Sequence, residues 1–277
     1  MPRCLSTLIA LVAVVIVPSA ITGCSINPAT GDRQLMLVPD AQVQAMGASA
    51  APQLTQEYGG EVQSPQLRAY VNRVGNALAA QVEPAYQQID WTFTVLDSDV
   101  INAFALPGGR VFISKGLLQR FTNEAQVAGV LGHEIGHVTA KHVNERVSQS
   151  MAIELGVAAI GHYSESQLAT AAASMFGNGY QLHFGRSQES QSDELGVRYM
   201  VRAGYNPRGM LQVLDVLREA SEGGQRQPEF LSTHPYPETR LETINGLLAG
   251  EYKQAANDPA LTFGEARFAK DAAPYLK

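Results

Sequence analysis

The chain has 277 residues, of which 45% are apolar, 17% are charged and 7% are aromatic. This length allows one large domain or two small ones, and the apolar share can build a full hydrophobic core, which excludes a disordered polyampholyte and a coiled coil. The formal net charge of −6 argues against a protein that binds the phosphates of nucleic acids. Two cysteines, Cys4 and Cys24, are too few for a disulfide scaffold or a cysteine-based zinc finger.

Residues 1–23 have the pattern of a secretory signal peptide. Arg3 precedes an apolar run over residues 5–17, and small residues then lead to Cys24. The sequence Ile21-Thr22-Gly23-Cys24 resembles the bacterial lipobox, in which cleavage precedes a cysteine that becomes lipid-modified. The alternative is an ordinary signal peptide cut near Ala20, which leaves Cys24 as a free thiol.

The lipid modification predicts where the protein resides. Several acyl chains on Cys24 give stable anchoring, and Ser25 resembles the residue that follows the cysteine in outer-membrane lipoproteins. We expect the periplasmic side of the outer membrane, with the inner membrane less favoured. No other stretch approaches 18 uninterrupted apolar residues, so no further membrane span is expected.

The rest of the chain predicts a short sheet between helices. Ser64 and Pro65 form a helix start, and apolar residues follow at three- to four-residue spacing at Leu67, Val71, Val74, Leu78 and Val82. Trp91–Val95 alternates like a strand. Residues 101–106 and 110–113 flank Pro107-Gly108-Gly109 like the strands of a hairpin.

Further helices are predicted at about Glu124–Val143, Ser187–Ala203, Pro207–Ala220 and Pro237–Leu248. Residues 148–185 are rich in alanine, serine and glycine and are interpreted as a lid, a partner surface or, more simply, a packed helical hairpin. The last 27 residues show no strong pattern. The predicted organisation is a signal peptide at 1–23, a lipidated tether at 24–39, a main domain at 40–251 and a tail at 252–277. The fold class is α+β and mainly α-helical, with a small antiparallel sheet or hairpin.

The motif that carries chemistry is His133-Glu134-Ile135-Gly136-His137, an H-E-x-x-H pattern. Residues four apart on a helix project from one face, so both imidazoles can bind one metal ion. Glu134 is rotated by about 100° from His133 and can reach a metal-bound water without being a ligand. The alternative is a core helix with solvated histidines, which the specificity of the motif disfavours.

A catalytic zinc ion needs a third protein ligand and an open position. A third histidine ten residues after His133, with glycine at the seventh, is excluded because Val143 and Ala140 stand there. Among later glutamates, Glu189 has an aspartate four residues on, Asp193, which can accept the ring N–H of a ligand histidine. Glu194 is the competing ligand.

Four motifs in order resemble a known family: Asn102–Gly109, Leu131–His137, Phe184–Asp193 and Thr233–Arg240. The chain is similar to the HtpX-, Oma- and CAAX-prenyl-protease-type zinc metallopeptidases (gluzincins) over about residues 40–250. It is most similar to their periplasmic lipoprotein, BepA/LoiP-like branch. Gly185 and Ser192 stand where the family usually has serine and alanine. BepA-like members carry a helical-repeat domain, for which the last 27 residues are too few.

The resemblance implies a zincin-like fold, one Zn²⁺ per chain held by His133, His137 and Glu189, and Glu134 as catalytic residue. It also implies that the strand with Asn102, Ala103, Phe104 and Ala105 edges the cleft, where extended substrate adds as a strand. By the same resemblance, His234 stabilises the oxyanion or occupies the open zinc position, and Arg240 holds that loop or the oxyanion. The other histidines, His142, His162 and His183, are expected to be structural.

These expectations together predict a zinc-dependent metalloendopeptidase that cleaves unfolded or misassembled outer-membrane proteins by a water that Glu134 activates. Its partners are unfolded polypeptides and the membrane, with assembly-machinery contacts as a further option and no nucleic acid. The alternative is a lipid-anchored assembly factor or chaperone with a latent or structural zinc site. A metal-transport lipoprotein is disfavoured because Glu134 would have no task in it.

Overall fold

The computed structural model describes residues 24–155, 183–223, 228–235 and 238–277. The predicted signal peptide, His162 and residues 156–182 of the alanine-, serine- and glycine-rich segment lie outside the described residues. None of the helices within the described ranges is long and apolar enough to cross a membrane.

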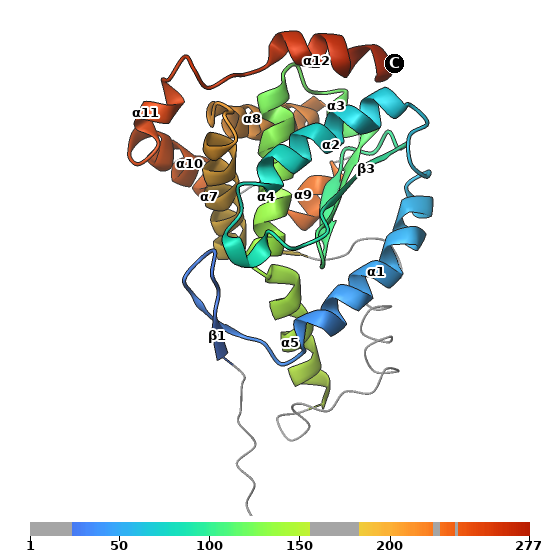
Figure 1. Ribbon diagram of the computed structural model, residues 1–277, viewed down its shortest axis with the longest axis vertical. Coiled ribbons are helices and arrows are strands. Elements are labelled where there is room, and N and C mark those ends of the chain that lie inside the picture. The colour runs from blue at the N-terminus through green and yellow to red at the C-terminus, as the bar shows by residue number, and fades with distance from the viewer. Residues whose placement is uncertain (1–23, 156–182, 224–227, 236–237) are drawn as a thin grey trace, which may run out of the picture.

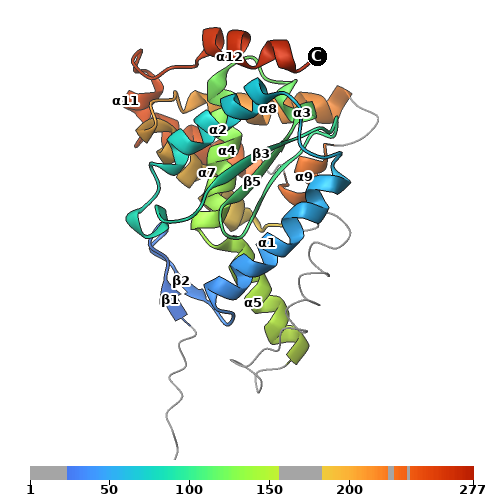
Figure 2. The same cartoon turned by 45° about the vertical axis from the view of Figure 1, so that its right-hand side comes forward.

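Helices make up most of the described fold (Figures 1 and 2). They are α1 (Asp40–Glu57), α2 (Pro65–Ala79), α3 (Lys115–Leu118), α4 (Glu124–Thr139), α5 (His142–Leu155), α7 (Arg186–Arg202), α8 (Arg208–Gly223), α9 (Glu229–Thr233), α10 (Glu238–Ala249), α11 (Lys253–Ala256) and α12 (Glu265–Asp271). The strands are β1 (Cys24–Ile26), β2 (Arg33–Leu35), β3 (Thr92–Leu96), β4 (Ala103–Leu106) and β5 (Arg110–Ser114). The predicted α+β, mainly helical fold is confirmed, and so are the predicted helices that correspond to α2, α7, α8 and α10.

The three-stranded sheet has the order β3-β5-β4. The predicted hairpin is confirmed: β4 pairs antiparallel with β5, with Phe104 opposite Phe112, and Gly108 and Gly109 supply positive φ values of 84° and 82° in the turn. The third strand, β3, pairs parallel with β5, with Phe93 opposite Val111. The sheet is therefore mixed rather than purely antiparallel, and β4 lies at its edge.

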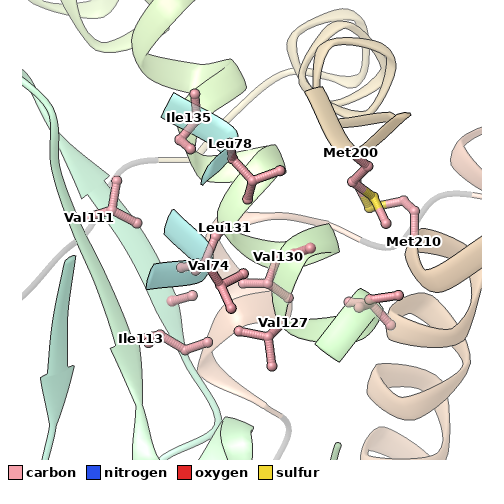
Figure 3. Packing of buried hydrophobic residues seen from close by; sticks show 14 of the residues in the cluster. Val74, Leu78, Val111, Ile113, Val127, Val130, Leu131, Ile135, Met200 and Met210 are labelled. Atoms are coloured by element: carbon pink, nitrogen blue, oxygen red, sulfur yellow. The ribbon is translucent and has the colours of Figure 1, made fainter. Parts of the chain in front are cut away.

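Helix α4 lies at the centre of the molecule, between the sheet and α2 on one side and α7 and α8 on the other (Figures 1 and 2). Every residue of α4 except Val138 is buried. Figure 3 shows Leu131 and Ile135 beside the side chains of α2 and β5, while Met200 and Met210 pack between α7 and α8. A helix that is buried on all sides gives its polar side chains a fixed, dry environment.

Local signals explain where α4 begins and ends. The Asn123 side chain accepts a hydrogen bond from the backbone N–H of Gln126 at 3.0 Å, and the Gln126 side chain accepts one from the N–H of Asn123 at 3.2 Å. The predicted continuation to Val143 is wrong: α4 ends at Thr139, because Lys141 adopts a left-handed conformation with φ 56°. Helix α5 then begins in a new direction at His142.

Residues 24–37, which were expected to form part of a tether, are folded against the end of α4. Strands β1 and β2 form an antiparallel pair, with Ser25 opposite Gln34. The buried side chains of Asn27 and Gln34 donate hydrogen bonds to the carbonyls of Thr139 at 2.9 Å and Ala140 at 2.6 Å. This hairpin therefore satisfies carbonyl groups that the end of a helix leaves without partners.

The last 26 residues also contain structure that the sequence did not predict. Helices α11 and α12 follow α10, and Phe268, Ala272 and Leu276 are buried in the same core as α2 and α4. The backbone N–H of Ala125 donates to the carbonyl of Phe263 at 2.9 Å. This segment therefore packs against the beginning of α4, at the top of the view in Figure 1.

Candidate metal centre

Helix α4 presents the two histidines of the motif side by side. Their Nε2 atoms lie 3.0 Å apart, and both rings are 1% exposed. Four residues along a helix return a side chain to nearly the same face, which explains the pairing. The sequence prediction that the two imidazoles converge therefore agrees with the observed geometry.

Helix α7 brings the acidic residue to this pair. Glu189 Oε1 lies 3.4 Å from His137 Nε2, and Glu189 Oε2 lies 3.6 Å from His133 Nε2. The competing candidate, Glu194, is not in the cluster: it pairs with Arg198 at 3.2 Å, and its side chain is 45% exposed.

Glycines allow α4 and α7 to approach closely enough for this arrangement. A Cβ atom at Gly136 would lie 2.8 Å from the carbonyl oxygen of Ser192, and one at Gly196 would lie 3.0 Å from the backbone nitrogen of His133. Side chains at these positions would push the two backbones apart. The glycine in the motif is therefore part of what places Glu189 beside the histidines.

His234 joins the cluster from the end of α9. Its Nδ1 lies 3.0 Å from Glu189 Oε1 and 3.3 Å from His133 Nε2, and it is fully buried. One potential ligand atom from each of His133, His137, Glu189 and His234 lies within 4.8 Å of the others. Tetrahedral zinc with bonds of 2.0–2.1 Å would separate its ligand atoms by about 3.3 Å, so the observed spacing fits such an ion.

Asp193 and Arg240 support the cluster from behind. Asp193 Oδ1 lies 2.8 Å from His133 Nδ1, and Arg240 donates to both Asp193 oxygens at 2.6 and 2.7 Å. A further Arg240 nitrogen lies 2.8 Å from Glu189 Oε2. Because the carboxylate of Asp193 only accepts, His133 carries its proton on Nδ1 and directs the Nε2 lone pair into the cluster. The structure thus places Arg240 on two carboxylates, and its predicted oxyanion role stays a prediction.

Carboxyl groups outnumber the permanently charged cations that are buried at the site. Glu134, Glu189 and Asp193 are each 0% exposed, and Arg240 is 1% exposed. Three carboxylates against one guanidinium leave two negative charges when Glu134 is ionised and the histidines are neutral, and in the absence of a metal ion one proton on Glu134 and one on His234 would balance them. Since uncompensated buried charge is costly, a divalent cation fits the donor set in charge as well as in spacing.

The pKa values of the buried groups are set by burial and by neighbouring charges, which act in opposite directions. Burial would raise the pKa of Glu189, but His234 and Arg240 hold it well below its usual range. Burial would likewise raise the pKa of Asp193, but Arg240 and His133 lower it. For His234 the order is reversed: burial lowers the pKa, and the carboxylates of Glu189 and Glu134 outweigh this effect and raise it. The two carboxyl groups beside the histidines are therefore ionised.

Glu134 differs from the other carboxyl groups of the site. Neither of its side-chain oxygens has a hydrogen-bond partner among the described residues, and the nearest ring nitrogen is His234 Nε2 at 3.6 Å. Burial raises the pKa of Glu134, against the opposing effect of His234 and His133. A buried carboxylate that is held beside the cluster without a partner is suited to exchange a proton with a molecule bound there.

Sequence reasoning missed the place of His142. Expected to be structural, it is buried, with Nδ1 3.0 Å from His137 Nδ1 and Nε2 2.9 Å from Gln191 Oε1. Burial lowers the pKa of His142 to about 4, so its ring is neutral. The left-handed residue Lys141 turns His142 back toward α4, and no sequence signal marked that turn. His183, by contrast, is exposed and contacts the carbonyl of Ser232 outside the cluster.

The four residues predicted to bind substrate, Asn102, Ala103, Phe104 and Ala105, are at most 1% exposed. Asn102 Nδ2 donates to Tyr58 Oη and to Glu229 Oε1, both at 3.1 Å. Since Glu229 begins α9 and α9 leads to His234, Asn102 links the edge strand to the helix that positions His234. The substrate-binding role of these residues stays a prediction.

Two histidines from one helix and a glutamate from a later helix are the same residue types as the His₂Glu set that binds zinc in metallopeptidases. The model of peptidase family M48 matches residues 65–248, about two thirds of the chain. The chain belongs to this family.

Curated relatives agree with this assignment. Mitochondrial metalloendopeptidase OMA1 of Arabidopsis thaliana is 32% identical over 156 residues, which cover 56% of this chain and 31% of the relative. Beta-barrel assembly-enhancing protease is 32% identical in Yersinia pestis over 218 residues, 75% of this chain and 42% of the relative. The Escherichia coli (strain K12) protein of that name is 30% identical over 189 residues, 65% and 38% of the two chains. The chain thus spans less than half the length of these relatives.

Proposed function

We propose that this protein is a zinc-dependent metalloendopeptidase in which His133, His137 and Glu189 hold the metal ion. The observation that carries the proposal is the buried cluster of four ligand atoms beside a carboxylate, Glu134, that has no partner among the described residues. A structural ion would not require Glu134, whose burial without a hydrogen bond costs stability.

Each group has a task in peptide hydrolysis. When bound, zinc lowers the pKa of a water molecule toward about 7 and polarises the scissile carbonyl. Glu134 accepts the proton of the attacking water and passes it to the leaving amine. Asp193 and Arg240 hold His133 and Glu189 in position, and Arg240 offsets part of their negative charge.

The position of His234 supports a closed state of this site. Its Nδ1 lies among the ligand atoms, where a catalytic zinc site keeps a position open for water or substrate. Of the two roles implied for His234, occupation of the fourth position is the one that the distances favour. Activation would then require His234 to leave, with α9 or the residues around it.

The proposed substrates are unfolded or misassembled proteins of the outer membrane. The names of the bacterial relatives support this class, and an extended chain is what could align with the edge strand β4. We further propose that Cys24 carries a lipid that anchors the protein to the periplasmic side of the outer membrane, as the lipobox-like sequence indicates.

The direct test is cleavage of an unfolded outer-membrane protein by the zinc-loaded protein, with and without a chelator. Wild type should cut only with metal, and Glu134→Gln should bind zinc with unchanged affinity but cut at least a hundredfold more slowly. His234→Ala should keep zinc and raise the rate if His234 closes the site. Unchanged cleavage by Glu134→Gln would show that Glu134 is not the base.

A second candidate is a lipid-anchored assembly factor with a latent zinc site. The convergence of four protein ligand atoms favours it, because structural zinc sites are closed in this way. Comparing Glu134→Gln with a gene deletion separates the two functions. Full rescue of outer-membrane assembly by Glu134→Gln would favour the assembly factor, and loss of rescue would favour the peptidase.

A further inference from the structure

We infer that Asp32, Gln191 and His142 are positioning residues that fix the tautomer of His137, so that the hairpin following Cys24 helps to prepare the metal centre. The inference rests on the proposed metal-binding role of His137. Asp32 lies in the turn just before β2, Gln191 lies on α7 and His142 is the first residue of α5. None of the three belongs to the proposed ligand set.

The four residues form one hydrogen-bonded series from the surface to the cluster. Gln191 Nε2 lies 2.7 Å from Asp32 Oδ2, and Gln191 Oε1 lies 2.9 Å from His142 Nε2. His142 Nδ1 lies 3.0 Å from His137 Nδ1. Each contact is within hydrogen-bond distance, and the series runs from an exposed aspartate to a ring that is 1% exposed.

The direction of every hydrogen bond follows from the first one. An ionised aspartate only accepts, so the amide nitrogen of Gln191 faces Asp32 and its oxygen faces His142. His142 must then donate from Nε2, which leaves its Nδ1 as an acceptor. His137 donates to it from Nδ1, and its Nε2 lone pair is free to bind metal.

The opposite direction would block the site. With the Gln191 amide reversed, an amide oxygen would face the carboxylate of Asp32 across 2.7 Å, acceptor against acceptor. His142 would then donate from Nδ1, and His137 would carry its proton on Nε2, inside the cluster. The Ser192 hydroxyl, 3.3 Å from His142 Nδ1, can donate or accept and so does not set the direction.

His137 needs a series of several hydrogen bonds to fix its tautomer, whereas His133 needs only one. A ligand histidine usually donates its second N–H to a group that only accepts, as His133 does to Asp193. The partner of His137 is another imidazole, which can donate or accept. Gln191 and Asp32 remove that ambiguity. Asp32 lies in the turn between β1 and β2, and Asn27 and Gln34 of the same hairpin donate hydrogen bonds to carbonyls at the end of α4.

The test compares variants at Gln191 by zinc affinity and by the tautomer of His137. Gln191→Met keeps the length of the side chain and removes both hydrogen bonds. In Gln191→Glu one carboxylate oxygen still accepts from His142, and the exposed side chain of Asp32 can turn away from the other oxygen into water. Chelator competition near pH 8 gives the zinc dissociation constant. Long-range ¹⁵N–¹H NMR of the zinc-free protein reports which nitrogen of His137 carries the proton. Glu194→Gln on the same helix is the control, because Glu194 contacts Arg198 and not the series.

We expect Gln191→Met to weaken zinc binding by about 10- to 100-fold and to convert His137 from the Nδ1–H form to a mixture of tautomers. Gln191→Glu should stay within about threefold of wild type, and Asp32→Ala should fall between the two. Equal losses in Gln191→Met and Gln191→Glu, or an unchanged tautomer in Gln191→Met, would overturn the inference. If wild type binds no zinc, the proposed function fails, while the NMR result still tests the series on its own.

Discussion

Gly136→Ala tests whether the close contact of α4 with α7 builds the metal centre. The added Cβ would lie 2.8 Å from the carbonyl oxygen of Ser192 and 3.1 Å from its Cα, both of which are backbone atoms. Ordinary contact begins at 3.4 Å, so the two helices must separate locally by about 0.6 Å. Ser192 lies between Glu189 and Asp193, and the displacement therefore moves both carboxylates away from the histidines.

The substitution should affect zinc affinity and folding stability to different extents. Metal–ligand distances tolerate about 0.2 Å, a third of the required shift, so zinc affinity should fall at least tenfold. Overpacking costs about 1–3 kcal/mol, and replacing a helical glycine by alanine returns about 1 kcal/mol. The net loss of stability in the zinc-free protein should therefore be at most about 2 kcal/mol, small beside the damage to the site.

The assay is chelator competition for zinc together with urea unfolding of the zinc-free protein. Gly129→Ala is the matched control on the same helix, because its Cβ would first meet a side-chain atom of Val213 at 3.3 Å. We expect Gly129→Ala to bind zinc like wild type. Wild-type affinity in Gly136→Ala, with the fold intact, would refute the claim that this contact sets the ligand geometry.

Three further predictions concern metal and stability. Zinc at a hundredfold excess over its dissociation constant adds about 2.7 kcal/mol to the free energy of unfolding, so a chelator should lower the thermal midpoint by about 5–10 °C. An unchanged midpoint would contradict a bound ion. Burial alone would raise the pKa of Glu124, but Arg73 and Arg267 lower it below its usual 4.5, so Glu124→Gln should cost about 1–2 kcal/mol near pH 7. That difference should begin to shrink as the pH falls below 4.5 and disappear once the pH is below the lowered pKa of the folded protein, and a constant difference in acid would argue against the ion pairs. Asn27→Ala leaves the carbonyl of Thr139 without its donor and should cost about 1–2 kcal/mol in urea unfolding, whereas the exposed Asn245→Ala should cost less than about 0.5 kcal/mol.

The parts of the fold that could be predicted are those with a local signal. The cap at Ser64 accepts a hydrogen bond from the N–H of Leu67 at 3.2 Å, and the helix begins at Pro65 as its sequence indicates. The turn at Gly108 and Gly109 gives the hairpin in the same way. The spacing of His133 and His137 predicted the paired rings, because four residues of helix fix that geometry regardless of the rest of the protein.

The parts that could not be predicted depend on contacts between distant segments. Left-handed residues are usually glycine or asparagine, and Lys141 is neither, so the sequence does not indicate the turn at this position. The placement of His142 against His137 was missed for this reason. Phe268 and Leu276 are buried only because the end of the chain returns to the start of α4. Likewise, nothing in residues 24–37 reveals that Asn27 binds a carbonyl 112 residues away.

The hairpin of β1 and β2 shortens the distance that can separate the metal centre from a bilayer to which Cys24 is anchored. A flexible segment of 16 residues, from 24 to 39, would span about 50 Å and would let the folded part of the protein move over a wide area. Strand β1 begins at Cys24 itself, and Asn27 is already fastened to the end of α4. If Cys24 carries the proposed acyl chains, the folded protein lies directly on the bilayer. A polypeptide must then come within about one protein radius of the membrane to reach the metal centre.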